Sequence, residues 1–368
     1  MNRYEKFKQL RGACEPTASD TTQAYFVDRP GGGAGRAIAE SLTLAPYAHH
    51  HLASAIGGGK SSEMRFAMAQ LNKQNPDVFT VWMDPTEHRH PFNDMGPNWL
   101  VEWVLHALVT TAETQGRLTS ERIRALVAPF LTVPSARPLG QAQSNFTASH
   151  VLGELVRHLH TPVTVFVDSI DRYDDSETLQ NVFANDLFVL SRLEVGLVCP
   201  VPLKWYLAPR DHGQGLSAMT VHFVRPAQLS APAERDWLEQ VVRQRDIHQL
   251  VDDMACQRLV QISGGIVRFL VQLMGIATER AYAAGQDKVT AQSVGAAIGQ
   301  FAQSSLVAGL RASDTEQLRR WQNGTLSTAS ITHFAEHVNL GRILLASADP
   351  GSATLHPMLL ELFESRAA

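Results

Sequence analysis

The sequence predicts an α/β fold: a parallel sheet flanked by helices, followed by an all-helical segment and a small unit that ends in paired strands and a helix. Two observations carry this prediction. Short, almost entirely apolar strand patterns alternate with helical patterns up to about residue 207, and from residue 229 the strand pattern disappears until the last part of the chain. Strands that are apolar on both faces are typical of parallel sheets covered by helices on both sides.

Four short apolar segments carry the strand pattern. Their residues are 50–56, 78–83, 163–167 and 203–207. Apolar residues elsewhere in this part recur three or four positions apart, as they do on one face of a helix. These helical segments are residues 36–44, 64–71, 99–112, 120–127, 149–159 and 179–190.

The second half begins with a helical pattern that continues to about residue 310. Ser230 is expected to be the N-cap of its first helix, with Pro232 in the first turn. The end of the chain then carries a helical segment, two short strand segments joined by a turn, and a terminal helix; these are residues 328–338, 342–346, 354–355 and 357 onward. Helices followed by a β-ribbon are arranged as in a small winged-helix unit.

Four parts are expected from these patterns. Residues 1–24 are polar without a sustained period and are expected to form a loosely held arm. The sheet and its helices occupy 25–228, the helical segment 229–310, and the winged-helix-like domain 311–368.

The composition is that of a folded protein: 44% of the 368 residues are hydrophobic and 18% are charged. Lys and Arg number 32 against 36 Asp and Glu, which argues against a protein whose main role is to coat nucleic acid. Cys14, Cys199 and Cys256 are too widely spaced for a disulfide framework, so a reducing cytoplasm is expected. The charged N-terminus has no apolar signal core, and no uninterrupted apolar stretch reaches the length of a membrane span.

The strongest chemical signal lies between a predicted strand and a predicted helix, at Gly57, Gly58, Gly59, Lys60, Ser61 and Ser62. Glycines let successive backbone N–H groups turn toward an anion, and the following helix points its positive end at it. Lys60 is expected to reach the β- and γ-phosphates and Ser61 to ligate Mg²⁺. Ser54 stands where the GxxxxGK[ST] pattern has its first glycine, so a flexible loop that happens to end in Lys-Ser is the alternative.

A second signal follows the strand at 163–167, which ends in Asp168, with Asp171 and Arg172 just behind it. An aspartate at the carboxyl end of a neighbouring strand can hold Mg²⁺, directly or through water. Asp171 is placed to orient or deprotonate an attacking water. The alternative is that both aspartates cap a turn and the next helix.

The motifs IGGGKSS and VTVFVDSIDR resemble those of P-loop ATPases of the AAA+/STAND type, most of all bacterial ATP-binding proteins with a C-terminal winged helix. The resemblance covers roughly residues 25–368. It implies a P-loop NTPase core that binds ATP and Mg²⁺, a helical lid, and a winged helix that senses or transmits the nucleotide state. It also implies that residues 25–29 form part of an adenine pocket, and it fits a setting in bacterial anti-phage defence.

The resemblance gives two further arginines a role at the γ-phosphate. Arg210 follows the segment 203–207, where such ATPases place a sensor residue, and Arg268 lies in SGGIVR, which is similar to the GxPR motif of the lid but has Val267 in place of proline. A surface side chain or a structural ion pair is the alternative for each. Arg172 and Arg192 are candidates for an arginine finger that acts on a neighbouring subunit.

Several other features are given structural interpretations. His356 is expected to cap or pin the last helix. His49, His50 and His51 enter a strand, where successive side chains alternate between faces, so no metal site is expected there. The cations of the winged-helix-like domain are offset by nearby acids, which favours contact with a protein over contact with DNA.

Three functions remain open at this point. The first is an ATP-driven switch that assembles with itself or with a partner protein, with ATP hydrolysis implied by the resemblance. The second is a nucleotide-binding scaffold with little hydrolysis, which Ser54 and the lack of an acid immediately after Asp168 favour. The third is a DNA-associated ATPase, against which the charge balance speaks.

Overall fold

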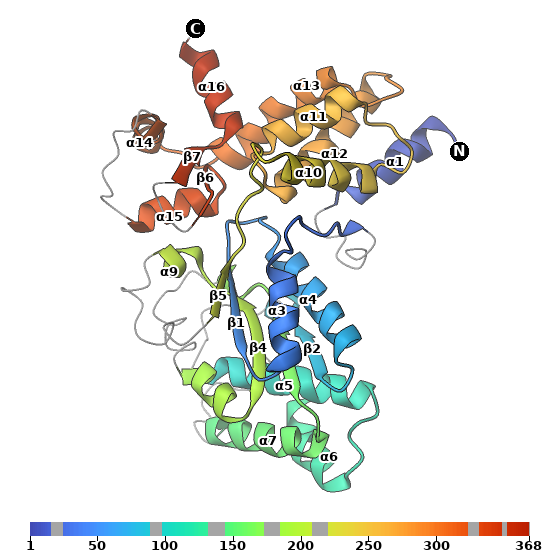
Figure 1. Cartoon of the computed structure of the whole chain (residues 1–368), viewed down its shortest axis with the longest axis vertical. Coiled ribbons are helices and arrows are strands. Elements are labelled where there is room, and N and C mark those ends of the chain that lie inside the picture. Colours follow the sequence, from blue (N-terminus) through green and yellow to red (C-terminus); the bar gives the residue numbers. More distant parts are fainter. Residues whose placement is uncertain are drawn as a thin grey trace. The chain divides into compact units, whose positions relative to one another are not determined.

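The structure, a computed structural model, describes residues 1–15, 25–88, 98–131, 144–172, 185–207, 220–322, 331–347 and 352–367 (Figure 1). Contacts divide the chain into two compact units. The first unit comprises Met1–Gly33, Ser54–Ser62 and Phe223–Ala368, and the second comprises Ala34–Ala53 and Glu63–His222. The glycine-rich segment therefore belongs by its contacts to the first unit, although the strand before it belongs to the second.

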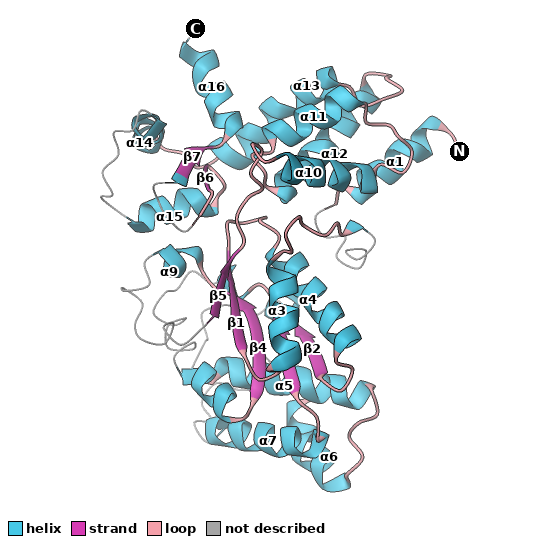
Figure 2. Ribbon diagram, viewed as in Figure 1, coloured by secondary structure: helices cyan, strands magenta, loops and turns pink. Residues whose placement is uncertain are grey.

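A five-stranded sheet forms the centre of the second unit (Figure 2). Its strands are β1 (His49–Ala53), β2 (Phe79–Met83), β3 (Val163–Val167), β4 (Val195–Pro200) and β5 (Thr220–Phe223). They lie in the order β2-β3-β4-β1-β5. The pairs β2–β3, β3–β4 and β4–β1 are all parallel. Every residue of β3 and β4 is buried, as expected for strands covered on both faces.

Helices accompany the strands in the second unit. They are α3 (Ala34–Leu44), α4 (Lys60–Gln74), which begins in the first unit, α5 (Trp99–Thr114), α6 (Glu121–Val127), α7 (Ser144–Leu159) and α9 (Leu203–Leu207). Short 3₁₀ turns cover Pro85–His88, Ala128–Phe130 and Ile170–Arg172. The predicted fold class, a parallel sheet flanked by helices and followed by a helical part, is confirmed.

The predicted strand at 203–207 is wrong. Those residues form α9, and the strand of this region is β4, eight residues earlier. Both segments are short and apolar, and periodicity cannot distinguish a buried strand from a buried helical turn at that length. The carbonyl of Pro202 accepts a hydrogen bond from Trp205 N (3.0 Å), which closes the first helical turn of α9.

The first unit is mainly helical. Its helices are α1 (Arg3–Ala13), α10 (Pro232–Arg245), α11 (Asp253–Ile262), α12 (Val267–Ala283), α13 (Ala291–Phe301), a π-helix over Ala302–Val307, α14 (Ala312–Gln322), α15 (Ile331–Asn339) and α16 (Pro357–Ala367). Strands β6 (Ile343–Leu345) and β7 (Ala353–Leu355) form an antiparallel ribbon before α16. The predicted helical stretch, ribbon and terminal helix are thus confirmed.

The expectation of a loosely held arm is wrong for residues 3–13. They form α1, which packs against α12 and buries Phe7, Leu10 and Ala13. Arg3 adds hydrogen bonds to the carbonyl oxygens of Gln286 and Tyr282, each at 2.9 Å. The three buried residues do recur at helical spacing, but over too few turns to stand out in a polar segment.

The predicted N-cap of α10 is also wrong. Ala231, not Ser230, occupies the cap position and offers no side-chain hydrogen bond, while Pro232 does lie in the first turn. The buried carboxylate of Glu234, in that first turn, instead accepts from Gln228 N (2.6 Å). A negative charge in the first turn of a helix is favourable.

The three cysteines are free and buried. Within the described parts of the chain, no helix has both the length and the hydropathy needed to cross a bilayer.

Candidate functional site

The glycine-rich segment forms a loop between β1 and α4. It runs from Ser54 to Gly59, and α4 begins at Lys60. Gly57 and Gly59 have φ of +82° and +99°, a backbone conformation that side chains strongly disfavour. The N-terminus of a helix exposes backbone N–H groups and the positive end of its dipole. The loop and the helix therefore have the local structure that the phosphate-loop interpretation requires.

The ammonium group of Lys60 lies on the loop itself. Its Nζ donates to Ser54 O at 3.0 Å and to Ala55 O at 3.3 Å, and the residue is 9% exposed. Neutral carbonyl oxygens are weaker partners for an ammonium than phosphate oxygens. Lys60 is thus held where a bound anion would offer it stronger acceptors. Ser61 and Ser62, also predicted to bind nucleotide, are half-buried in the first turn of α4.

Ser54 and Gly58 fit together across the loop. A Cβ at position 58 would overlap the Ser54 Oγ and lie 3.2 Å from Ser54 Cβ. The Ser54 hydroxyl donates to Ala55 O at 3.0 Å, and Ser54 is 1% exposed. Ser54, which departs from the phosphate-loop pattern, therefore fits because Gly58 has no side chain. The spacing of residues in the sequence did not indicate this pairing.

The structure brings the predicted Arg268 to this loop. Its backbone N donates to Gly57 O at 3.4 Å, and a Cβ on Gly57 would lie only 2.6 Å from Arg268 Cβ. Arg268 is the second residue of α12. Gly57 is therefore needed both for its positive φ and for this close approach.

Asp168 and Asp84 form an acidic group in the second unit. Asp168 directly follows β3 and is 7% exposed, and its Oδ1 accepts from Ser169 N at 2.7 Å. Ser169 has a φ of +63°, and its hydroxyl donates to Asp84 Oδ2 at 3.0 Å. Asp84 follows β2, the strand next to β3, and its Oδ1 accepts from Thr86 N at 2.9 Å.

Asp84 was not among the predicted residues. The sequence could have indicated Asp84, because it directly follows an apolar strand, as Asp168 does. Asp171 lies in the 3₁₀ turn Ile170–Arg172 and is half-buried. The carboxylates of Asp84 and Asp168 are oxygen ligands of the kind that Mg²⁺ prefers.

The segment 25–29 is held by α10. Trp237 Nε1 donates to Val27 O at 2.9 Å, and Arg29 forms an ion pair with Glu234 at 3.1 Å. Burial raises the pKa of Glu234, but hydrogen bonds from Arg225, from a backbone N–H and from Arg29 outweigh it and lower the pKa to about 2. The role of residues 25–29 as part of an adenine pocket stays a prediction.

The remaining predicted residues have different outcomes. Arg210 lies outside the described residues. Arg192 lies over the ring of Phe188, with 4.6 Å between the guanidinium carbon and the ring centroid, and Arg172 is exposed. The prediction for His356 is confirmed, because its Nδ1 accepts from Met358 N at 3.2 Å in the first turn of α16.

The three successive histidines of β1 meet separate partners. His49 Nε2 lies 3.0 Å from Val195 O, His50 Nδ1 lies 3.1 Å from His222 Nε2, and His51 Nδ1 lies 3.3 Å from Cys199 Sγ. The expected alternation between faces of the strand explains why adjacent residues have different neighbours.

No family model matches the sequence, and no curated protein matches it significantly. Among solved structures, the chain is similar to the Aeropyrum pernix ORC1 protein in complex with DNA (14% identity, 97% of this chain and 98% of that one, TM-score 0.49). It is also similar to the Aeropyrum pernix ORC2 protein in its ADP form (15% identity, 96% of each chain, TM-score 0.48). A third similar structure is Cdc6p from Pyrobaculum aerophilum (11% identity, 97% and 98% coverage, TM-score 0.45).

Proposed function

We propose that this chain binds ATP together with Mg²⁺ and hydrolyses it, as a nucleotide-driven switch that assembles with itself or with a partner protein. The observation that carries the proposal is the loop from Ser54 to Gly59, which opens into α4 and holds the ammonium of Lys60 on its own carbonyl oxygens.

The loop supports binding of a phosphate chain because positive groups converge on it. Backbone N–H groups at the start of α4 and the Lys60 ammonium lie on the loop, and the side-chain carbons of Arg268 lie beside Gly57. On binding, Lys60 exchanges two carbonyl oxygens for phosphate oxygens. Arg268 is then a residue through which α12 responds to the nucleotide.

The acidic group supports a role for Mg²⁺. Strands β1, β4 and β3 run in parallel, so their carboxyl ends lie at one edge of the sheet, and Asp168 directly follows β3 there. The carboxylates of Asp168 and Asp84 and the hydroxyl of Ser61 are oxygen ligands of the kind that Mg²⁺ prefers. When bound, Mg²⁺ supplies positive charge to the phosphates. Asp171 orients the attacking water and accepts its proton.

The choice of adenine, the protein partner and a setting in bacterial defence follow from the resemblance of IGGGKSS and VTVFVDSIDR to AAA+/STAND ATPases. A scaffold that binds nucleotide without turnover is the alternative that Ser54 favours, and the experiment below separates the two.

The test is calorimetric titration of the full chain with Mg·ATP, comparing wild type with Lys60→Ala. Loss of a charged hydrogen-bond partner costs about 1.5–3 kcal/mol, so binding should weaken by roughly 10- to 100-fold. Lys73→Ala is the matched control, because Lys73 is an exposed lysine near the other end of the same helix. Equal affinity in all three folded proteins, or no binding by wild type, contradicts the proposal.

Phosphate release then separates switch from scaffold. Asp171→Asn should retain Mg·ATP affinity and lose turnover, because the loop that binds the phosphates is unchanged. Asp168→Asn should lose the dependence of binding on Mg²⁺. Tight binding with no phosphate release in wild type selects the scaffold instead.

A further inference from the structure

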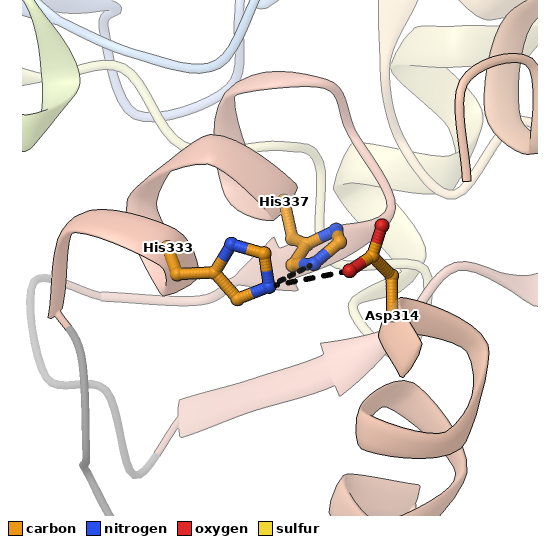
Figure 3. Close-up of side chains that lie close together, drawn as sticks. All are labelled: Asp314, His333 and His337. Atoms are coloured by element: carbon orange, nitrogen blue, oxygen red, sulfur yellow. Dashed lines mark hydrogen bonds and ion pairs between the residues drawn. The ribbon is translucent and has the colours of Figure 1, made fainter. Parts of the chain in front are cut away.

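Three metal-ligating side chains meet outside the candidate nucleotide site, on the last part of the first unit. They are Asp314 of α14 and His333 and His337 of α15 (Figure 3). One ligand atom of each residue lies within 4.8 Å of the ligand atoms of the other two. The two histidines are four positions apart on one helix, which places them on the same face.

Two of the three separations are close to those in a metal coordination sphere. His333 Nε2 lies 3.3 Å from His337 Nε2 and 3.7 Å from Asp314 Oδ1. Zinc binds imidazole nitrogen at about 2.0–2.1 Å in tetrahedral geometry, which puts neighbouring ligand atoms about 3.3–3.4 Å apart. The two His333 separations are therefore close to the spacing of ligands on one ion, and the third pair, His337 and Asp314, lies within 4.8 Å.

Polar groups lie beside two of the ligands. The Glu336 carboxylate lies 3.7 Å from His333 Nδ1, close enough to move into a hydrogen bond, and a carboxylate bonded to the far nitrogen of a metal-bound histidine fixes the ring and its tautomer. Asp314 is held at the start of α14, where its Oδ2 accepts from Arg311 N at 2.9 Å. Its Oδ1 is the atom that faces His333.

His337 has one contact that a metal would displace. Its Nδ1 lies 3.5 Å from an amino nitrogen of Arg342. Coordination through Nε2 puts the ring proton on Nδ1, so this contact must be given up. Arg342 keeps its two shorter hydrogen bonds, from Nε to Leu306 O at 2.8 Å and from the other amino group to Ala308 O at 2.7 Å. The exchange therefore costs the weakest of its three contacts.

We propose that Asp314, His333 and His337 bind a divalent transition-metal ion, zinc in the first place, and that the ion joins α14 to α15. Two imidazoles and a carboxylate suit zinc better than Mg²⁺ or Ca²⁺, which prefer oxygen ligands alone. His337 is buried and the Asp314 side chain is 14% exposed, whereas the His333 side chain is 38% exposed. The exposed side leaves room for water as a fourth ligand.

The test uses the full chain, freed of metal with a chelator and titrated with Zn²⁺ against a chromophoric zinc indicator. Wild type should bind one equivalent, and Zn²⁺ should raise its Tm. Loss of a group that only supports a metal ligand weakens metal binding by roughly 10- to 100-fold, and Glu336→Gln should fall in that range. Loss of a ligand itself, in His333→Ala or Asp314→Ala, should weaken Zn²⁺ binding by more. Both ligand variants change side chains with solvent exposure, so the fold should tolerate them.

His150→Ala is the matched control, since His150 is an exposed histidine of α7. It should bind Zn²⁺ as wild type does. Co²⁺ bound to wild type should show the intense visible bands of a four-coordinate ion, and His333→Ala should lack them. The proposal is overturned if wild type takes up no stoichiometric Zn²⁺, or if His333→Ala and Asp314→Ala bind it as tightly as wild type.

Discussion

At the residue scale, the candidate loop depends on the fit between two small residues. Ser54 is buried where the phosphate-loop pattern has a glycine, and its hydroxyl occupies the space that a side chain at position 58 would need. Gly58 does not have a positive φ, so the constraint on it is steric rather than conformational. This distinction makes the pairing testable by a double substitution.

Gly58→Ala should weaken Mg·ATP binding and destabilise the fold by about 1–3 kcal/mol, the usual cost of an extra methyl group in a packed site. Ser54→Gly combined with Gly58→Ala should restore much of both, because it removes the Oγ and Cβ that the new methyl group meets. Urea unfolding and nucleotide titration of the single and double variants measure the coupling. Additive effects of the two changes would show that Ser54 does not constrain position 58.

At the element scale, α5 is capped by a residue far along the chain. Asp186 is buried, and its carboxylate oxygens accept from Asn98 N at 2.8 Å and Leu100 N at 2.7 Å. Asn98 itself, the local N-cap, has a φ of +65° and makes no side-chain hydrogen bond to the helix. The cap is therefore a tertiary contact, and no local capping pattern in the sequence pointed to it.

Asp186→Ala should lower the free energy of unfolding by about 1–2 kcal/mol, since it leaves two backbone N–H groups at the start of α5 without this acceptor. Burial raises the pKa of Asp186 to about 7, so urea unfolding is best compared at pH 8, where the carboxylate is charged. Asp186→Asn keeps one acceptor oxygen and should cost less. Asp236→Ala, at an exposed aspartate of α10, is the control, and an equal effect there would refute the capping role.

Also at the element scale, sequence periodicity predicts strands well where an apolar run stands alone. The strands at 79–83 and 163–167 were predicted within a residue, because each is an isolated apolar run between turn residues. Between 187 and 207 the apolar residues are interrupted only by short polar stretches, and the strand was predicted at 203–207 instead of 195–200. Pairing with β1 and β3, rather than any local pattern, selects 195–200 as a strand.

At the scale of the whole molecule, His356 joins the C-terminal helix to a distant part of its own unit. Its Nε2 donates to Ser263 O at 3.1 Å at the end of α11, while its Nδ1 accepts from Met358 N. The ring is fully buried, and burial lowers its pKa to about 4. Protonation would turn the Nδ1 acceptor into a donor and place a charge in this interior.

This contact predicts a loss of stability in acid. The folded-state pKa of about 4 lies below the usual 6.5, so the contribution of His356 is complete above about pH 6.5 and is lost as the pH falls toward 4. A shift of this size corresponds to roughly 3 kcal/mol at pH 4. His356→Gln keeps an acceptor and a donor but cannot be protonated. Wild type should therefore lose more stability than this variant between pH 6.5 and 4 in urea unfolding, whereas parallel losses would contradict the assignment.

The sequence by itself determined the α/β class, the glycine-rich loop between strand and helix, and the aspartate that directly follows β3, because these depend on local periodicity and on residue types at fixed spacing. Tertiary structure decided the rest. It fitted Ser54 to Gly58, brought Arg268 to Gly57, and gathered Asp314 with His333 and His337 from two helices. These contacts join residues distant along the chain, and only the packing of apolar faces determines which of them meet.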